Sequence, residues 1–302
     1  MAEWVMKKLK DIADFNPRES LAKGTVAKKI GMDKLQPFCR DVLGYDLEQF
    51  SGGTKFRNGD TIMARITPCL ENGKTAKVSI LDDGEVGFGS TEYIVFRAKN
   101  SVDEDFIYYL VCSPLVREPA IKSMVGSSGR QRVQTDVVQN LEIMVPDYEE
   151  QRRISGLLKS LDDKIALNNA INNNLEYQAE ALFHSLFVEN VNPIWKDGVL
   201  SDLGTIVAGG TPSKTKPEYY SEKGIAWITP KDLSLNKSKF ISHGEIDISE
   251  LGFSKSSATK MPTGTVLFSS RAPIGYIAIA ANEVTTNQGF KSVVPNENVG
   301  TV

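Results

Sequence analysis

The chain has 302 residues, 41% hydrophobic and 8% aromatic, which is enough for globular cores and long enough for more than one domain. Its net charge of -3 argues against a strongly cationic nucleic-acid binder, and no apolar run approaches the ~18 residues of a membrane span. Three scattered cysteines and two histidines have no metal-binding spacing. We therefore expect a cytoplasmic protein with no metal and no cofactor.

The acidic charge is concentrated in the middle of the chain. Residues 1–146 contain 20 basic and 20 acidic side chains, residues 147–190 contain 4 and 8, and residues 191–302 contain 11 and 10. The two flanking segments are therefore almost neutral, which leaves room for local basic patches in either of them.

The first segment, residues 1–146, alternates short β-type runs with Gly, Asn and Asp turns. The pattern predicts a mixed α/β domain with one helix at Asp105–Cys112 and an irregular sheet whose strands pair out of sequence order. The predicted strands are Thr61–Ile66, Lys77–Leu81, Tyr93–Arg97 and Leu141–Val145.

Residues 147–190 predict a single long helix of the coiled-coil type. Its seam positions follow a 4-3-4-3 spacing, which is typical of a helix packed along its length against another helix. We expect Asp147 to cap its start, with Glu150 reaching back to complete a capping box. The seam consists of Ile154, Leu158, Leu161, Ile165, Asn168, Asn172, Leu175, Ala179, Leu182 and Leu186.

Such a helix is about 60 Å long at ~1.5 Å per residue, so it projects from a small domain. An ordinary amphipathic core helix is the alternative, although core helices rarely exceed ~20 residues. Asn168 and Asn172 lie in the middle of the seam. They either fix the register of a helix pair or mark a place where the seam opens to water.

Residues 191–302 repeat the first segment. Trp4 and Trp195 are 191 residues apart, and the same offset relates Leu9 and Asp11 to equivalent residues of the second segment. RNGDTIMARITP (57–68) parallels PTGTVLFSSRAP (262–273), which pairs Arg65 with Arg271, and GSTEYIVF (89–96) parallels NQGFKSVV (287–294). Matches in the same order indicate a duplicated domain.

The chain lacks recognisable catalytic motifs. Asn16-Pro17-Arg18 and Asn192-Pro193-Ile194 do not fit the Asn/Asp-Pro-Pro-aromatic motif of amino-methyltransferases. No glycine-rich nucleotide-binding loop follows a strand, and GGTPSKT (209–215) lacks the Gly that precedes Lys in a phosphate-binding loop. We expect a protein that is not an enzyme.

Four segments resemble the DNA-specificity subunits of type I restriction–modification systems. GGTPSKTKPEYYSEKGIAWITPKDL (209–233), RAPIGYIAIA (271–280) and TTNQGFKSVVP (285–295) look like parts of a target-recognition domain, and VPDYEEQRRISGLLKSLDDKI (145–165) looks like the junction with the conserved helix. The resemblance implies two recognition domains that each read half of a split double-stranded DNA site. It also implies modification subunits docked on the helices, which methylate adenine, and restriction subunits that join the complex.

Candidate DNA contacts are polar residues on loops that follow strands. A Gly/Ser loop at 126–134 is suited to entering a DNA groove. Each candidate has the alternative of a solvated surface side chain. The candidates are Arg65, Thr67, Arg130, Gln131 and Arg132 in the first segment, and Lys214, Lys216, Lys231 and Arg271 in the second.

Aligning residues 288–290 with residues 91–93 puts Val302 opposite Asp105. The second recognition domain is then expected to be incomplete and the second conserved helix to be missing, as in a C-terminally shortened chain. Self-association through residues 154–186 is one way to supply a partner helix. The alternative function is a protein-interaction or oligomerisation module that does not bind DNA.

Overall fold

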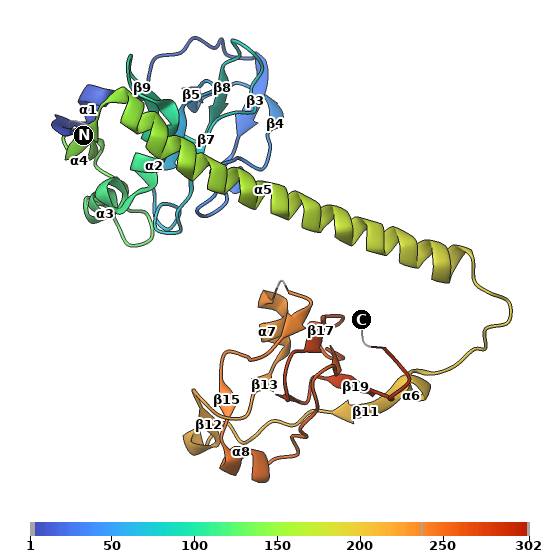
Figure 1. Ribbon diagram of the computed structural model, residues 1–302. Coiled ribbons are helices and arrows are strands. Elements are labelled where there is room, and N and C mark those ends of the chain that lie inside the picture. Colours follow the sequence, from blue (N-terminus) through green and yellow to red (C-terminus); the bar gives the residue numbers. More distant parts are fainter. Residues whose placement is uncertain (1–3, 237, 301–302) are drawn as a thin grey trace. The chain divides into compact units, whose positions relative to one another are not determined.

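The computed structural model describes residues 4–236 and 238–300, which form two compact units, residues 1–185 and residues 186–302 (Figure 1). Both units mix strands and short helices, as the sequence predicts. Within the described residues, no helix combines the length and the apolar composition that crossing a membrane requires.

Unit 1 contains two four-stranded sheets and one separate strand pair. In each of them, strands that are neighbours in space are not always neighbours in sequence. The first sheet has the antiparallel order β2-β9-β6-β7, and the second has the order β4-β3-β8-β5 with β3 and β8 parallel. The separate pair joins β1 (Trp4–Lys8) to β10 (Glu142–Pro146). The sheet strands are β2 (Ala13–Phe15), β3 (Val26–Ile30), β4 (Asp46–Gln49), β5 (Thr54–Phe56), β6 (Thr61–Ala64), β7 (Thr75–Lys77), β8 (Gly87–Gly89) and β9 (Tyr93–Ala98).

The β2-β9-β6-β7 sheet separates two apolar cores because alternate residues of a strand point to opposite faces. Met63 and Ile94 pack in the core that contains the helices, whereas Ile62 and Val95 pack in the core that contains the second sheet. These four side chains are fully buried. The helices are α1 (Leu9–Ile12), α2 (Glu104–Cys112), α3 (Pro114–Lys122) and α4 (Thr135–Gln139), with a 3-10 turn η1 at Met32–Lys34.

Most predicted elements of this unit are confirmed, with ends that shift by at most two residues: β6, β9, β10 and α2. The strand predicted at Lys77–Leu81 is wrong, because the strand there is β7, which ends at Lys77. Beyond it, the side chain of Asn58 accepts a hydrogen bond from the Leu81 amide and donates one to the Leu81 carbonyl. The side-chain amide of Asn58 therefore provides the hydrogen bonds that a neighbouring strand would otherwise make to Leu81.

The predicted long helix is confirmed as α5 (Tyr148–His184), which continues as the π-helical turn η2 (Ser185–Glu189). Its 37 residues span about 55 Å at ~1.5 Å per residue. Asp147 caps the helix as predicted, accepting a hydrogen bond from the Glu150 amide at 2.9 Å. The predicted capping box is wrong, because the Glu150 carboxylate pairs instead with Arg153 at 2.6 Å, one turn further along the helix.

The first turns of α5 are attached to unit 1. The buried amide of Gln151 donates to the Pro146 carbonyl at 2.9 Å and accepts from the Asp103 amide at 3.0 Å. Further along, Asp162 accepts a hydrogen bond from the hydroxyl of Tyr109 at 2.7 Å, and Asp163 pairs with Arg40 at 2.7 Å. These contacts hold one face of α5 against the domain.

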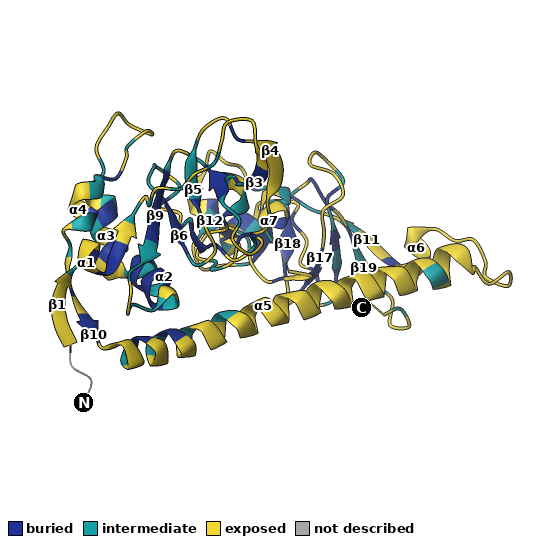
Figure 2. Cartoon of the chain, turned by 90° about the horizontal axis from the view of Figure 1, so that it is seen from above, coloured by how far each residue is buried: buried dark blue, intermediate teal, exposed yellow. Residues whose placement is uncertain are grey.

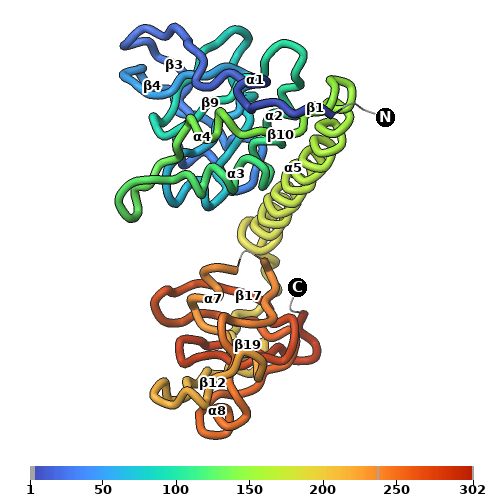
Figure 3. Tube along the Cα trace, turned by 90° about the vertical axis from the view of Figure 1, so that its left-hand side faces the viewer, coloured from blue at the N-terminus to red at the C-terminus, as the bar shows by residue number. Residues whose placement is uncertain are grey.

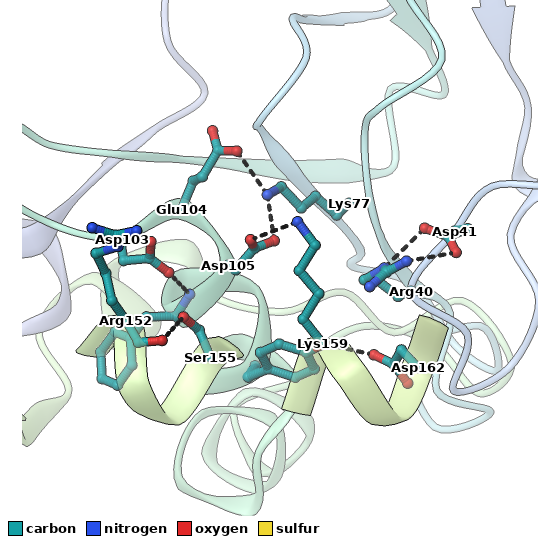
Figure 4. A network of polar contacts seen from close by, with 12 residues as sticks. Arg40, Asp41, Lys77, Asp103, Glu104, Asp105, Arg152, Ser155, Lys159 and Asp162 are labelled. Carbon is teal, nitrogen blue, oxygen red and sulfur yellow. Dashed lines mark hydrogen bonds and ion pairs between the residues drawn. The ribbon is translucent and has the colours of Figure 1, made fainter. Parts of the chain in front are cut away.

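A second group of contacts links α5 to α2 and β7 (Figure 4). Lys77 pairs with Glu104 and Asp105 at the start of α2, and Lys159 of α5 approaches Asp105 at 3.5 Å. Burial works to raise the pKa of Asp105, but its contacts with Lys77 and Lys159 outweigh burial and lower that pKa. The Asp105 carboxylate therefore stays ionised between two lysines that come from different elements.

The rest of α5 is exposed along its length (Figure 2). Ile154 and Leu158 are half-buried near the domain, whereas the later apolar residues of the predicted seam are 49–60% exposed. The seam lies on a different side of the helix from Gln151, Ser155 and Asp162, which face unit 1. Exposed apolar residues that the 4-3 spacing omitted, Leu157 and Ile171, extend the same stripe.

Unit 2 contains a five-stranded sheet with the order β11-β19-β16-β17-β14 and two small strand pairs, β12-β15 and β13-β18. Its main core lies between this sheet and the β13-β18 pair and includes Ile228, Leu267 and Phe290. The helices are α6 (Leu200–Leu203), α7 (Pro230–Leu235) and α8 (Glu250–Ser254), with a 3-10 turn η3 at Pro217–Tyr219. The strands are β11 (Gly204–Ala208), β12 (Tyr220–Ser221), β13 (Trp227–Ile228), β14 (Phe240–Ile241), β15 (Asp247–Ile248), β16 (Val266–Phe268), β17 (Ile277–Ala280), β18 (Thr285–Thr286) and β19 (Lys291–Pro295).

The predicted duplication is visible in the order and register of the strands. The order β2-β9-β6-β7 in unit 1 matches β11-β19-β16-β17 in unit 2. Ala64 pairs with Tyr93, and the residues 205 and 197 positions later, Ser269 and Phe290, form the same antiparallel bridge. Each unit therefore contains its own copy of the same sheet, with the same strand order and equivalent residue pairs.

The starts of the two units also match. In α1 the Asp11 carboxylate accepts a hydrogen bond from the Lys8 amide at 3.0 Å, and in α6 Asp202 accepts from the Val199 amide at 2.8 Å. Within the described part of residues 191–302, the chain has no counterparts of α2, α3, α4 and β10.

Candidate nucleic-acid interface

The loop between α3 and α4 brings the candidate contacts of unit 1 together. This loop, residues 123–134, runs beside the chain that follows β6 and projects from the unit (Figure 3). The Thr67 amide donates to the Gln131 carbonyl at 3.0 Å, and the Val133 amide donates to the Arg65 carbonyl at 2.9 Å. Candidates 65 positions apart in sequence therefore form one surface.

Glu92 organises the basic side chains of this surface. Arg132 binds its carboxylate with two nitrogens at 2.7–3.0 Å, and the Nε of Arg65 lies 3.8 Å from it. The hydrogen bond from Arg132 outweighs burial and lowers the pKa of Glu92. Arg132 is thus held by an internal partner, while Arg130 and Gln131 are half-buried or exposed and have no side-chain partner among the described residues.

Arg65 also belongs to a cleft of about 530 Å³ in unit 1. Three segments form the cleft: the chain after β2, the chain after β6, and the turn before β9. Its lining consists of Asn16, Pro17, Arg18, Glu19, Thr54, Lys55, Arg65, Thr91 and Tyr93.

The acidic side chain of this cleft is neutralised within the domain. Glu19 pairs with Arg57 at 2.7 Å and with Arg97 at 2.7 Å. Arg18 is exposed and has no side-chain partner among the described residues. The Nε of Arg65 donates no hydrogen bond there, and its contact with the Glu92 carboxylate is a long ion pair of 3.8 Å. The cleft therefore contains one cation without a partner and one that is held only loosely.

Unit 2 has a cleft of about 740 Å³ in the equivalent place. It contains three of the four candidate contacts predicted for this segment, Lys214, Lys231 and Arg271. Its lining also includes Thr211, Tyr220, Trp227, Thr229, Pro230, Asp232, Glu245, Ile246, Ala272, Pro273, Asn287, Gln288 and Gly289.

The fourth candidate, Lys216, does not line this cleft; its ammonium group lies 5.2 Å from the centre of the Tyr219 ring. Lys231 pairs with Glu245. Lys214 and Arg271 are exposed and have no side-chain partner among the described residues. Two cations without a side-chain partner among the described residues therefore line the cleft of unit 2.

The predicted equivalence of Arg65 and Arg271 needs a correction. The Arg65 amide donates to the Glu92 carbonyl at 2.9 Å, and the matching bond in unit 2 comes from the Ser270 amide to the Gly289 carbonyl at 2.8 Å. The counterpart of Arg65 is therefore Ser270, and Arg271 lies one residue further along. Both arginines still line the cleft of their own unit, because each follows the same strand.

Sequence reasoning missed several residues of the two clefts: Arg18, Lys55, Thr91 and Gln288. Arg18 and Thr91 are far apart in sequence and become neighbours only through the pairing of β2 and β6 with β9. Asn16-Pro17 was a usable signal, since it predicts a turn directly after a strand. Among the described residues, no group of three His, Cys, Asp or Glu side chains is placed to hold a metal ion.

A duplicated domain with one basic cleft per copy, followed in its first copy by a long exposed helix, defines a modular binding protein. Residues 1–177 and 194–300 match the family described as the type I restriction modification DNA specificity domain. The chain belongs to this family.

Two curated relatives are specificity subunits of type I restriction enzymes. The MjaIX subunit of Methanocaldococcus jannaschii is 39% identical over 125 residues, which is 41% of this chain and 29% of that protein. The HindI subunit of Haemophilus influenzae is 25% identical over a match that covers 80% of this chain and 67% of that protein. A solved type I restriction–modification S subunit from M. genitalium has the same fold, with a TM-score of 0.56 at 15% identity, over 98% of this chain and 74% of that one.

Proposed function

We propose that this chain is the DNA-recognition subunit of a type I restriction–modification complex and performs no catalysis itself. The observation that carries the proposal is the repetition of one domain, with a cleft in the same place that is lined by cationic side chains in each copy. Two related sites of this kind suit a DNA target with two separately read halves, because phosphate contacts fix the position of a domain while base contacts select the sequence.

The long helix α5 suits the role of a spacer. Its length of about 55 Å exceeds one turn of duplex, which is ~34–36 Å. Its hydrogen bonds and ion pairs to unit 1 fix the direction in which it leaves that domain. A rigid helix would therefore determine how many base pairs remain unread between the half-sites.

The partners follow from the exposed surfaces and the family. Near-neutral recognition domains supply few phosphate contacts, so modification subunits bound along α5 would add contacts and carry the adenine methylation. Restriction subunits would join that complex. The exposed stripe on α5 also fits a second helix, and we propose that two copies of this chain associate through Leu161, Ile165, Leu175, Leu182 and Leu186.

The test is to co-express the chain with its cognate modification subunit in a host without adenine methylation and to map methylated adenines across the genome. A new motif in two separated parts is expected. The modification subunit expressed alone is the control.

The two halves of the motif are informative. Halves that are inverted repeats would indicate that a helix-paired dimer reads with unit 1 alone, and unrelated halves would indicate that both units read DNA. The absence of any new motif, with both proteins folded and bound to each other, would refute the proposal in favour of a protein-interaction module.

A further inference from the structure

We propose that Thr91 and Gln288 are the equivalent specificity-determining residues of the two domains, each reading a base edge in its own half-site. The inference rests on the proposed function, since it assigns base contacts within the two recognition domains. It is carried by the geometry of the turns that hold these residues.

The two turns have the same backbone hydrogen bond. In unit 1 the amide of Tyr93 donates to the carbonyl of Ser90, and in unit 2 the amide of Phe290 donates to the carbonyl of Asn287, both at 3.3 Å. The same strands follow the turns, because β9 and β19 occupy equivalent places in the sheets.

A side chain supports each turn in the same way. The Ser90 hydroxyl accepts a hydrogen bond from the Glu92 amide at 3.1 Å, and the Asn287 side-chain oxygen accepts one from the Gly289 amide at 2.8 Å. Side chains of Ser and Asn stabilise turns by binding the amide two residues ahead. These hydrogen bonds fix the backbone conformation of the residue between Ser90 and Glu92 and of the residue between Asn287 and Gly289.

That intervening residue is Thr91 in unit 1 and Gln288 in unit 2. Both are exposed, both line the cleft of their unit, and neither side chain has a hydrogen-bond partner among the described residues. A neutral polar side chain on a supported turn can donate to or accept from a base edge without first breaking an internal contact.

Cationic side chains line the same cleft in each unit. They are Arg18 and Arg65 in unit 1, and Lys214 and Arg271 in unit 2. Cations bind phosphates of any sequence, whereas a neutral polar residue in the same cleft can distinguish bases. The residue type differs between the two units while its surroundings remain basic, which fits two domains that read different bases in the same way.

The chemistry of the two side chains gives the expected preferences. A glutamine amide matches the N6 and N7 edge of adenine with two hydrogen bonds, while threonine offers one hydroxyl and a methyl group suited to thymine. Gln288 should therefore discriminate more strongly than Thr91.

The experiment compares the methylated motif of the complete complex for the wild type, Thr91→Ala, Thr91→Gln and Gln288→Ala. Gln288→Ala should lower the preference for one base of one half-site by roughly ten- to a hundredfold. Thr91→Ala should relax one base of the other half-site by about tenfold, and Thr91→Gln should create an adenine preference there. The unaffected half-site of each variant serves as an internal check that the protein folds.

Matched controls are Thr25→Ala and Gln49→Ala, which change exposed residues of the same two types that line neither cleft. Both should retain the wild-type motif. If Thr91→Ala and Gln288→Ala also retain it, the inference is overturned while the proposed function stands. If the wild-type complex itself selects no sequence, the proposed function fails and the inference fails with it.

Discussion

At the scale of single residues, the fold of unit 1 depends on carboxylates that hold arginines in place. Arg97 binds the buried Asp60 with two nitrogens at 2.6–2.7 Å and donates to Glu19 at 2.7 Å. Burial works to raise the pKa of Glu19, but hydrogen bonds from Arg97 and Arg57 outweigh it, so that pKa lies below its ordinary value of 4.5. This cluster positions the loop that carries Arg18 into the cleft.

A pH dependence follows from Glu19. Because its pKa is lower in the folded state than in the unfolded state, its contribution to stability is complete above about pH 4.5 and is lost as the pH falls through the folded value. We expect Glu19→Gln to reduce stability at pH 7 and to flatten the loss of stability below pH 4.5. Hydrogen exchange of the amides in β6 and β9, measured against pH, tests this.

The control for this measurement is Glu142→Gln, which changes an exposed carboxylate on β10 with no ion pair among the described residues. It should leave the pH profile of the wild type unchanged. A profile of Glu19→Gln as steep as that of the wild type would show that other carboxylates govern the acid response.

At the scale of elements, α5 has two sides with different roles. One side holds the domain through Gln151, Tyr109–Asp162 and Arg40–Asp163, and the other presents an exposed apolar stripe. Each leucine or isoleucine that becomes buried in a helix pair contributes roughly 1.5–3 kcal/mol. Burial of the stripe against another helix would therefore favour the self-association proposed above.

We expect the combined change Leu161→Ser, Ile165→Ser and Leu175→Ser to weaken self-association at least about a hundredfold, because three apolar side chains leave the interface. Sedimentation at micromolar concentration measures the oligomeric state. Tyr177→Ser is the control, since Tyr177 is also exposed on α5 but lies on the side of the helix away from the stripe. A wild-type chain that sediments as a monomer would contradict this prediction.

At the scale of the whole molecule, the architecture consists of one domain used twice. Strand order, register and turn hydrogen bonds agree between the units although their sequences differ at most positions. A shared scaffold lets the cleft residues change while the sheet is preserved, which would suit the two domains of the proposed function. Under that proposal, the length of α5 would contribute to the spacing of the two half-sites.

We expect deletion of residues 167–173 to change the length of the unread spacer and to leave both half-site sequences unaltered. Seven residues are one complete 4-3 repeat of the seam, so the apolar stripe stays in register. The deletion shortens the helix by about 10 Å, which corresponds to a change of at most about three base pairs. Mapping methylation for the deletion variant measures the spacer, and altered half-sites would argue against independent domains.

The sequence by itself determined the features that depend on local pattern: the long helix with its Asp147 cap, the apolar seam, the strands β6, β9 and β10 of unit 1, and the duplication. Periodicity and turn residues report these directly, because each is decided by neighbours within a few positions. Only the tertiary structure decided which loops meet. Thr91 and Gln288 carry no local signal, and they line the same clefts as Arg18 and Arg271 because distant strands pair side by side. The shift from Arg65 to Ser270 likewise depends on register, which is set by pairing rather than by sequence spacing.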